Sequence, residues 1–222
     1  NAFILYFNDQ FGFKKKHGSD MAIFSLKQVI EYYNLRSSPV YVCFLDASKA
    51  FDRLNYWILF RKLLDRGIPN IFIRFFCYWY FHQQLCVKWG CSQSEKFTTV
   101  NGVRQGGIIS PIFFNVYMND LSDKLKNADA GCCFNGYSMN HLFYADDSCL
   151  LAPSPAGLQS LVNICVDYSL GNTIIYNVKK TKCMCFKPTK RKSLNLPRIW
   201  LNDKSLEYVE TFKYLGVCIY QL

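Results

Sequence analysis

The sequence lacks any apolar run long enough to cross a bilayer, and it lacks a signal peptide. The longest apolar stretches, such as residues 72–81, are interrupted by Arg74 and fall short of the roughly 20 residues that a membrane helix needs. Internal repeats and low-complexity tracts are also absent. These absences exclude a membrane-spanning protein and a repeat array, and we expect an intracellular protein with no membrane partner.

Acidic residues are scarce. The 222 residues include 16 Asp and Glu against 26 Lys and Arg, which leaves a net charge of +10. Half of the residues are hydrophobic and 17% are aromatic, so a substantial core can form and disorder is not expected. The positive charge favours a polyanionic partner such as nucleic acid or an acidic membrane surface, although a solvated basic surface would give the same composition.

The eleven cysteines do not form a Cys-x-x-Cys pair anywhere in the chain. Cys132 and Cys133 are adjacent, and Cys183 and Cys185 are separated by one residue, so neither pair has the usual zinc-binding spacing. We interpret the cysteines as buried free thiols of a reducing compartment, in preference to a disulfide set or a metal site.

Hydrophobic periodicity indicates an α+β fold in which helices pack on an antiparallel sheet. Strand signals occur at 40–45, in a pair around Gly90, in a hairpin at 143–151, and in lysine-rich or short segments at 178–186 and 198–222. Helix signals occur at 21–33, from Asp52 to Gly67, at 70–81, after Ser110 and at 158–170. Asp20 is the expected N-cap of the first of these helices, and Ser110, followed by Pro111, is the expected N-cap of the fourth.

The stretch HLFYADDSCLL, residues 141–151, places Asp146 and Asp147 inside an apolar run. Two adjacent carboxylates resist burial, so they belong at a hairpin tip, either as an ordinary turn or as ligands of a cation. The apolar run 40–45 also ends in a carboxylate, Asp46. If these strands are neighbours, Asp46 and Asp146 meet, and Mg²⁺ would offset their repulsion.

Several sequence blocks, in this order, resemble those of a known family. They are QFGFKKKH (10–17), FLDASKAFD (44–52), GVRQGGIISP (102–111), YADD (144–147), NVKKTK (177–182) and FKYLGV (212–217). The chain resembles the reverse transcriptase domain of non-LTR retrotransposons, in particular the jockey and CR1-like group. The resemblance extends from about residue 8 to residue 217.

The resemblance implies roles for individual residues. Asp46, Asp146 and Asp147 would carry the metal ions, with Asp147 in a supporting position, and Lys180 would be the general acid, although Lys179 and Lys182 remain alternatives. The implied nucleotide-binding residues are Ala47 and Ser48 through their N–H groups, Phe51 as the gate against a 2′-hydroxyl, Gln105, Gly106 and Lys14. The implied template-binding or primer-binding residues are Arg104, Gly107, Tyr214, Leu215 and Gly216.

The resemblance also implies a right-hand polymerase palm with partial fingers. The fingers would comprise about 1–39 and 53–110, and the palm about 40–52 and 111–222. The chain departs from the family pattern at Lys16 and Gly18, where the family usually has glycine and a hydroxyl residue. We find no thumb, endonuclease or zinc-knuckle segment, and we expect a truncated domain of a longer protein.

The implied function is RNA-directed DNA polymerisation with two Mg²⁺ ions, for which Mn²⁺ could substitute. The partners would be an RNA template, a DNA primer, deoxynucleoside triphosphates and an endonuclease domain of the same polyprotein, in the nucleus and cytoplasm. Two alternatives stay open: a nucleic-acid-binding fragment or decayed copy without catalysis, and an intron maturase-like reverse transcriptase.

Overall fold

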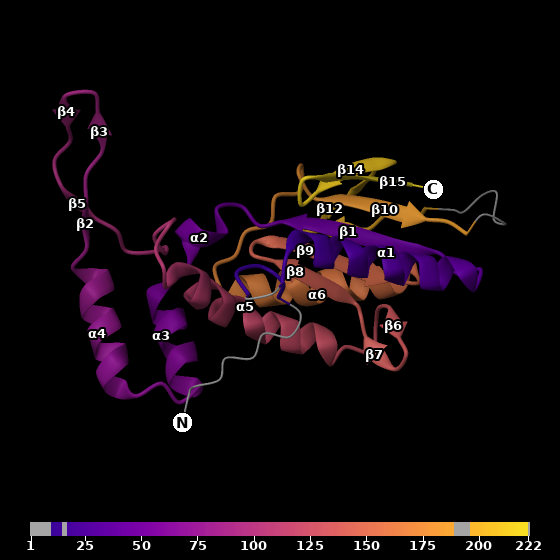
Figure 1. Ribbon diagram of the computed structural model, residues 1–222, viewed down its shortest axis with the longest axis horizontal. Helices are drawn as coiled ribbons and strands as arrows, with labels where there is room; N and C mark the ends of the chain where they lie inside the picture. The colour runs from indigo at the N-terminus through magenta and orange to yellow at the C-terminus, as the bar shows by residue number, and fades with distance from the viewer. Residues whose placement is uncertain (1–9, 15–16, 189–195, 222) are drawn as a thin grey trace.

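The computed structural model describes residues 10–14, 17–188 and 196–221. Its central feature is a five-stranded sheet in the order β13-β10-β1-β9-β8 (Figure 1). The strands are β1 (Val40–Asp46), β8 (His141–Tyr144), β9 (Asp147–Ala152), β10 (Lys182–Phe186) and β13 (Glu207–Tyr208). The pairs β8–β9, β9–β1 and β1–β10 are antiparallel, and β10–β13 is parallel. The predicted α+β class is confirmed, with a mixed sheet in place of a wholly antiparallel one.

The central strand β1 is buried from Val40 to Leu45 and becomes accessible only at Asp46. Its sequence, VYVCFLD, is apolar on both faces of the pleat, as expected for a strand covered on both sides. Tyr41, Cys43 and Leu45 belong to one hydrophobic core, whereas Val40, Val42 and Phe44 belong to a second. A continuous apolar run therefore places the terminal carboxylate at the edge of the buried sheet.

Helices cover both faces of the sheet. α5 (Ser110–Lys126) and α6 (Pro155–Gly171) contribute to the first core, and α1 (Ser19–Leu35) contributes to the second. The hairpin of β14 (Thr211–Tyr214) and β15 (Val217–Tyr220) also lies over the second core, where Phe212 stacks on Phe44 with ring centroids 4.5 Å apart. The predicted short strands with a turn near Gly216 are thus confirmed.

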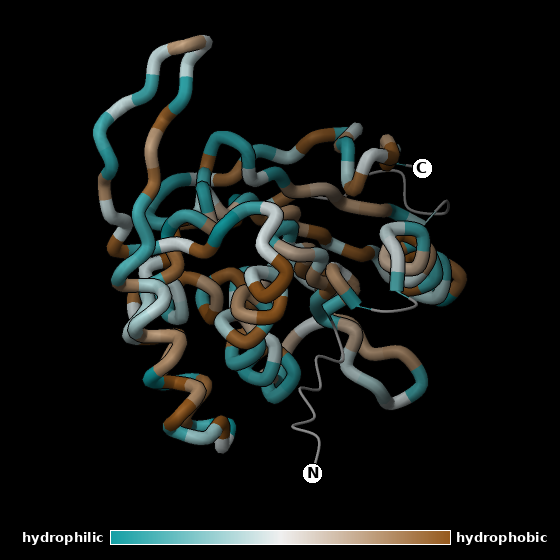
Figure 2. The backbone as a smooth tube through the Cα atoms, turned by 60° about the vertical axis from the view of Figure 1, so that its left-hand side comes forward, coloured by the Kyte–Doolittle hydropathy of each residue, from teal (hydrophilic) through white to brown (hydrophobic). Residues whose placement is uncertain are grey.

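A second region extends away from the sheet in Figure 1. It consists of α3 (Tyr56–Asp65), α4 (Asn70–Phe81) and a long projecting hairpin. The hairpin pairs β2 (Gln84–Leu85) with β5 (Phe97–Thr98) and β3 (Lys88–Trp89) with β4 (Ser92–Gln93). The predicted strand pair around Gly90 is confirmed. Figure 2 shows that α4, at the foot of this hairpin, carries hydrophobic residues along its length.

Several predicted boundaries were wrong, because side-chain caps and turns interrupt the periodic pattern. The helix expected from Asp52 is divided into α2 (Ala50–Arg53) and α3, since the side chain of Asn55 accepts hydrogen bonds from the Trp57 and Ile58 N–H groups and begins a new helix. The strand expected at 178–186 begins at Lys182, after a turn.

Two predicted N-caps were also wrong. α1 begins at Ser19, so Asp20 lies inside the first turn. α5 begins at Ser110, which makes Ile109 the N-cap. All eleven cysteines are free, but the predicted burial was wrong for Cys86, Cys91, Cys133 and Cys218, which are exposed. The remaining short strands are β6 (Cys133–Phe134), β7 (Tyr137–Ser138), β11 (Trp200–Leu201) and β12 (Lys204–Ser205). Among the described residues, no helix is both long and apolar enough to traverse a bilayer.

Candidate active site

Three carboxylates meet at one edge of the central sheet. Strand pairing places Asp46, the last residue of β1, directly opposite Asp147, the first residue of β9. Tyr144 also pairs with Asp147, so Ala145 and Asp146 form the two-residue turn of the β8–β9 hairpin. Directly opposed residues of an antiparallel pair share one face of the sheet, and Asp46 and Asp147 are therefore neighbours. The expectation named Asp146 as the acid that meets Asp46. The residue in register with Asp46 is instead Asp147, and Asp146 precedes it in the turn.

Partial burial and neighbouring negative charges raise the pKa values of Asp146 and Asp147. Burial raises the pKa of Asp146, and the charge of Asp46 raises it further, although a backbone hydrogen bond at Asp146 lowers it in part. Partial desolvation raises the pKa of Asp147, and the charges of Asp146 and Asp46 add to this effect. Such mutual repulsion between like charges is the electrostatic condition that a bound divalent cation relieves.

The segment after α6 wraps around the end of β1. The Asn177 N–H donates to the Asp46 carbonyl at 2.9 Å, and the Asp46 N–H donates to Thr181 Oγ1 at 3.2 Å. The Asn177 side chain also accepts from the N–H groups of Lys179 and Lys180, which explains why this segment is a turn instead of a strand. The block NVKKTK is thereby attached to the catalytic end of the sheet.

Among the three candidate lysines, the structure brings Lys180 to the carboxylates. Its Nζ lies 4.0 Å from Asp46 Oδ1, and its side chain is 69% exposed, so it can move toward a ligand. Lys182 instead forms an ion pair with Glu207. Lys180 therefore has the better position for the predicted general acid.

The predicted sugar gate, Phe51, is held by aromatic packing. Its ring stacks on Phe114 with centroids 4.4 Å apart and an interplanar angle of 11°. Phe13 approaches the same ring edge-on at 6.2 Å. Phe51 is half-buried on α2, five residues after Asp46, the last residue of β1. Packing against both of these rings restricts the movement of the Phe51 ring, and a steric gate requires such a restricted side chain.

The expectation that Ser48 offers its N–H to a triphosphate conflicts with the structure. That N–H donates to the Ile175 carbonyl at 2.8 Å, and Ala47 forms an isolated β-bridge with Tyr176. The turn after β1 is thus attached to the segment that follows α6. The Ser48 amide could contact a ligand only if this hydrogen bond broke.

The glycine-rich loop 102–107 lies beside α2. The Gly102 N–H donates to the Leu54 carbonyl at 2.8 Å, and the Val103 N–H donates to the Phe51 carbonyl at 2.9 Å. A Cβ at Gly102 would lie 2.7 Å from the Asp52 carbonyl oxygen, so this close approach requires glycine. Two backbone hydrogen bonds therefore join the loop to the helix that carries the predicted gate.

The tip of this loop is accessible, but one of its predicted contacts is already engaged. Gln105 and Gly106 are exposed, and Gly106 has a positive φ of 81°. Arg104 Nε donates to Gln83 Oε1 at 2.7 Å, so its guanidinium group is fixed against the foot of the projecting hairpin. The Gly107 N–H donates to the Arg104 carbonyl at 3.0 Å and closes the loop.

The FKYLGV hairpin lies near the carboxylates, and its tyrosine is an anchor. Tyr214 is 3% exposed and its ring packs against Phe44 at 5.0 Å. Burial raises the pKa of Tyr214 strongly, and the charges of Cys149 and Asp147 raise it further. Tyr214 therefore anchors the hairpin to the core, and the primer contact predicted for it stays a prediction. Leu215 and Gly216 form the turn at the tip, both with positive φ.

In the basic run KKKH, Lys14 is half-buried, and its carbonyl oxygen accepts a hydrogen bond from the His17 N–H at 3.1 Å. The neighbouring Lys15 and Lys16 lie outside the described residues. The role predicted for Lys14 stays a prediction.

A family model for reverse transcriptase (RNA-dependent DNA polymerase) matches residues 2–219. The chain belongs to the reverse transcriptase family. Its curated relatives are the polyproteins of non-LTR mobile elements, which confirms the predicted resemblance.

The relatives are much longer than this reverse transcriptase domain. The R2DM polyprotein of Drosophila melanogaster is 27% identical over 199 residues, which are 85% of this chain and 18% of the relative. The jockey polymerase of Drosophila funebris is 24% identical over 216 residues, which are 95% of this chain and 23% of the relative. The R2 polyprotein of Popillia japonica is 26% identical over 211 residues, with 88% and 33% covered. The chain thus spans a third or less of each relative.

Solved structures with the same fold include telomerases. Apo telomerase from Candida tropicalis superposes with a TM-score of 0.65 at 14% identity, over 97% of this chain and 36% of that one. A form truncated from the C-terminal domain gives a TM-score of 0.64 at 15% identity, over 96% and 40%. At this identity the likeness shows the fold, and it confirms the predicted polymerase palm.

The donor chemistry of this reverse transcriptase domain fits a hard divalent cation, since three carboxylates from β1 and the β8–β9 hairpin are neighbours. Within residues 10–14, 17–188 and 196–221, no group of three or more His, Cys, Asp or Glu side chains converges in metal-binding geometry. The structure therefore supplies the ligand types and their order on the strands.

Sequence analysis missed two residues of the site. Thr181 is fully buried and accepts the N–H of Asp46. Gln10 is 5% exposed and accepts the N–H of Ala145 in the YADD turn. Both residues lie inside blocks that carry the family resemblance, and this position was the only sequence signal for them. The hydrogen-bond partner of each residue is 135 positions away in the sequence.

Proposed function

We propose that this chain is the catalytic core of an RNA-directed DNA polymerase of a mobile element. The observation that carries the proposal is the pairing of Asp46 with Asp147, beside Asp146, at the accessible edge of a reverse transcriptase palm. The reaction would be attack of a primer 3′-hydroxyl on the α-phosphate of a deoxynucleoside triphosphate, with pyrophosphate as the leaving group.

Asp46, Asp146 and Asp147 would hold Mg²⁺, or Mn²⁺ as a substitute. When bound, the metal would supply Lewis-acid stabilisation of the charge that develops on the attacking and leaving oxygens. Lys180, 4.0 Å from Asp46, would donate a proton to the leaving pyrophosphate. The rigid Phe51 ring would exclude a 2′-hydroxyl, and the accessible Gln105 would lie over the new base pair.

The proposed partners are an RNA template and a DNA primer. The net charge of +10 supports a polyanionic partner. The relatives are named as polyproteins, which supports an endonuclease domain elsewhere in the same longer protein, and the proposed location is the nucleus and cytoplasm. Telomerases of the same fold have been solved with a fragment of telomeric RNA.

The test is primer extension on an RNA template with labelled deoxynucleotides, in Mg²⁺ and separately in Mn²⁺. We expect extension by the wild-type chain and a loss of about 10³-fold or more in Asp146→Ala, because several kcal/mol of transition-state stabilisation would disappear. Asp167→Ala is the matched control, because Asp167 is an exposed aspartate of α6 and is not one of the three carboxylates of β1 and the β8–β9 hairpin.

A folded wild-type chain that extends no primer, yet binds nucleic acid with a steep salt dependence, would contradict the proposal. It would support the alternative of a nucleic-acid-binding module without catalysis. Equal extension by the wild type and Asp146→Ala would also contradict it, since the carboxylate would then have no catalytic role.

A further inference from the structure

The turn that carries Asp146 contains a non-glycine residue in an unfavourable backbone conformation. Ala145 has a positive φ of 54°, in the left-handed region that an L-residue with a Cβ enters at a cost of about 1 kcal/mol. Such conformations persist where the surrounding structure holds them in place. Ala145 is 8% exposed, so its backbone N–H and C=O also need hydrogen-bond partners within the protein.

Both backbone groups of Ala145 are bonded by one side chain, that of Gln10. Gln10 Oε1 accepts the Ala145 N–H at 3.0 Å, and Gln10 Nε2 donates to the Ala145 carbonyl oxygen at 3.4 Å. The same Oε1 accepts the Gly12 N–H at 2.8 Å, which fixes the carboxamide relative to its own segment. The side chain is 5% exposed, so water does not compete for these bonds.

The segment around Gln10 is seated tightly on the hairpin. The Phe11 N–H donates to the Phe143 carbonyl at 2.8 Å, and Gln10 forms a parallel bridge with Phe143. A Cβ added at Gly12 would lie 2.5 Å from the Ala145 backbone nitrogen, a separation that no side chain can occupy. Asn115 of α5 donates to the Gly12 carbonyl at 3.5 Å and holds the segment from the other side.

We propose that Gln10 is a positioning residue that fixes the backbone of the Ala145–Asp146 turn, and with it the place from which the Asp146 carboxylate reaches a divalent cation. Gln10 acts through the backbone of Ala145 and does not touch substrate. The inference rests on the proposed function for the claim that Asp146 binds a cation. The claim that Gln10 holds the turn does not depend on that function. Residues that orient metal ligands in this way typically contribute 10- to 100-fold to metal affinity or activity.

The experiment compares the wild-type 222-residue chain with Gln10→Met, which fills a similar volume but removes all three hydrogen bonds. The first measurement is amide hydrogen exchange at Ala145, for which we expect exchange at least 10-fold faster in Gln10→Met. The second is Mn²⁺ binding followed by electron paramagnetic resonance, for which we expect a dissociation constant about 10-fold higher or more. Neither measurement depends on turnover.

Two further variants separate positioning from general stability. Gln10→Glu keeps an oxygen that accepts the N–H groups of Ala145 and Gly12 but loses the donor to the Ala145 carbonyl oxygen, so we expect exchange protection at Ala145 between that of the wild type and that of Gln10→Met. Gln28→Ala is the control, because Gln28 is exposed on α1. We expect it to change neither quantity. Gln10→Glu also keeps the inference testable if Gln10→Met fails to fold.

Unchanged Mn²⁺ affinity in folded Gln10→Met would overturn the inference, and so would a wild-type chain that binds no Mn²⁺. Unchanged exchange at Ala145 would overturn it as well. A wild-type chain that binds Mn²⁺ with Gln10-dependent affinity but extends no primer would leave the inference standing and contradict the proposed polymerase function. The failures of the two proposals are therefore distinguishable.

Discussion

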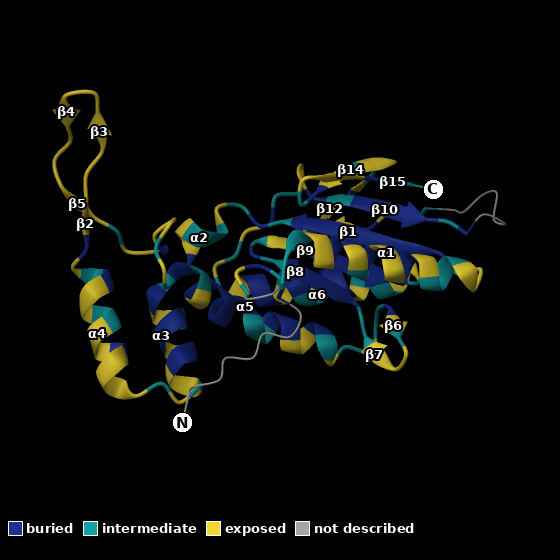
Figure 3. Ribbon diagram, viewed as in Figure 1, coloured by how far each residue is buried: buried dark blue, intermediate teal, exposed yellow. Residues whose placement is uncertain are grey.

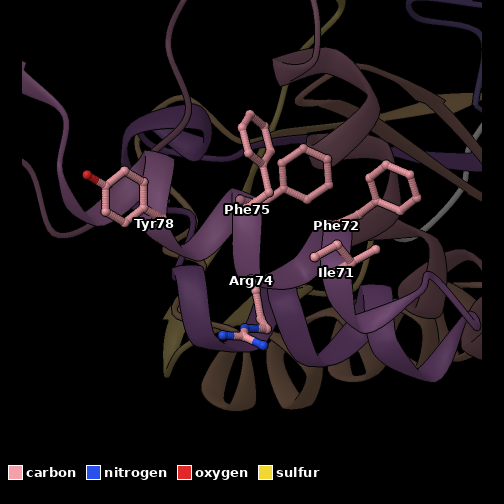
Figure 4. Close-up of a pocket in the computed structure, with 6 residues that line it drawn as sticks. Ile71, Phe72, Arg74, Phe75 and Tyr78 are labelled. Carbon is pink, nitrogen blue, oxygen red and sulfur yellow. The ribbon is translucent and has the colours of Figure 1, made fainter.

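The central sheet and α4 are both rich in apolar residues, but the sheet buries them and α4 exposes most of them. In β1 and β9 the apolar side chains are almost wholly buried, whereas in α4 only Ile73 and Tyr80 are buried (Figure 3). Figure 4 shows Ile71, Phe72 and Phe75 standing out from α4 around a shallow hollow, with Arg74 directed away from Phe75. In the sheet, burial of the strands fixes the positions of Asp46 and Asp147 at the strand ends. On α4, the described residues leave an apolar surface uncovered.

The junction between these two regions is a buried charge cluster. Lys62 of α3 forms an ion pair with Asp120 of α5, and its Nζ also donates to the Tyr168 hydroxyl of α6 at 3.0 Å. Arg66 Nη2 approaches Asp120 at 2.6 Å. α3 is thereby attached to the helices under the sheet, so the change from buried to exposed packing occurs between α3 and α4.

The largest expected difference in the free energy of unfolding is between two substitutions to alanine, one in each region. Leu150→Ala should lower the free energy of unfolding by about 3 kcal/mol, because Leu150 is fully buried in β9 and its loss creates a cavity. Ile71→Ala should change it by less than ~0.5 kcal/mol, because Ile71 is 67% exposed on α4. Urea unfolding measures both. Equal losses would mean that α4 is covered in solution, for example by self-association.

An intermediate effect is expected at the junction. Asp120→Ala should cost about 2 kcal/mol, less than a fully buried pair, because its side chain is 37% exposed while Lys62 remains buried without its partner. Asp167→Ala, an exposed aspartate on α6, is the control and should be nearly neutral. Thermal unfolding of both variants tests this. A neutral Asp120→Ala would show that packing alone attaches α3.

The smallest expected effect is a pH dependence of the same junction. Burial acts to raise the pKa of Asp120, but hydrogen bonds and charges from Lys62 and Arg66 outweigh it and lower the pKa below 3.8. A depressed folded-state pKa stabilises the fold above the unfolded value of 3.8 and loses that contribution as pH falls through the folded value.

The stability difference between the wild type and Asp120→Asn should therefore be constant from pH 7 to about 5 and shrink toward pH 3, by at most ~1 kcal/mol. Urea midpoints across that range measure it. A difference that grows as pH falls would have the wrong sign and would exclude this ion pair as its source.

Much of the site was predictable because it depends on local patterns. The run 40–45 is apolar on both faces and ends in Asp46, and YADD places two acids at the tip of an apolar hairpin, so their meeting followed from strand pairing. The bond from Ser48 to Ile175 and the clamp of Gln10 on Ala145 were not predictable. Each joins residues more than 120 positions apart, and nothing in the local sequence specifies the partner.

The pairing of Asp46 with Asp147 has a consequence for when this end of the sheet can form. The chain between the two residues must be synthesised and folded back before β1 gains β9 as a neighbour, and closure over such a separation is intrinsically slow. A nascent or prematurely terminated chain that stops before residue 147 contains Asp46 but lacks the opposing carboxylate. Such a chain therefore cannot form the paired-carboxylate end of the sheet, however intact the residues that it retains.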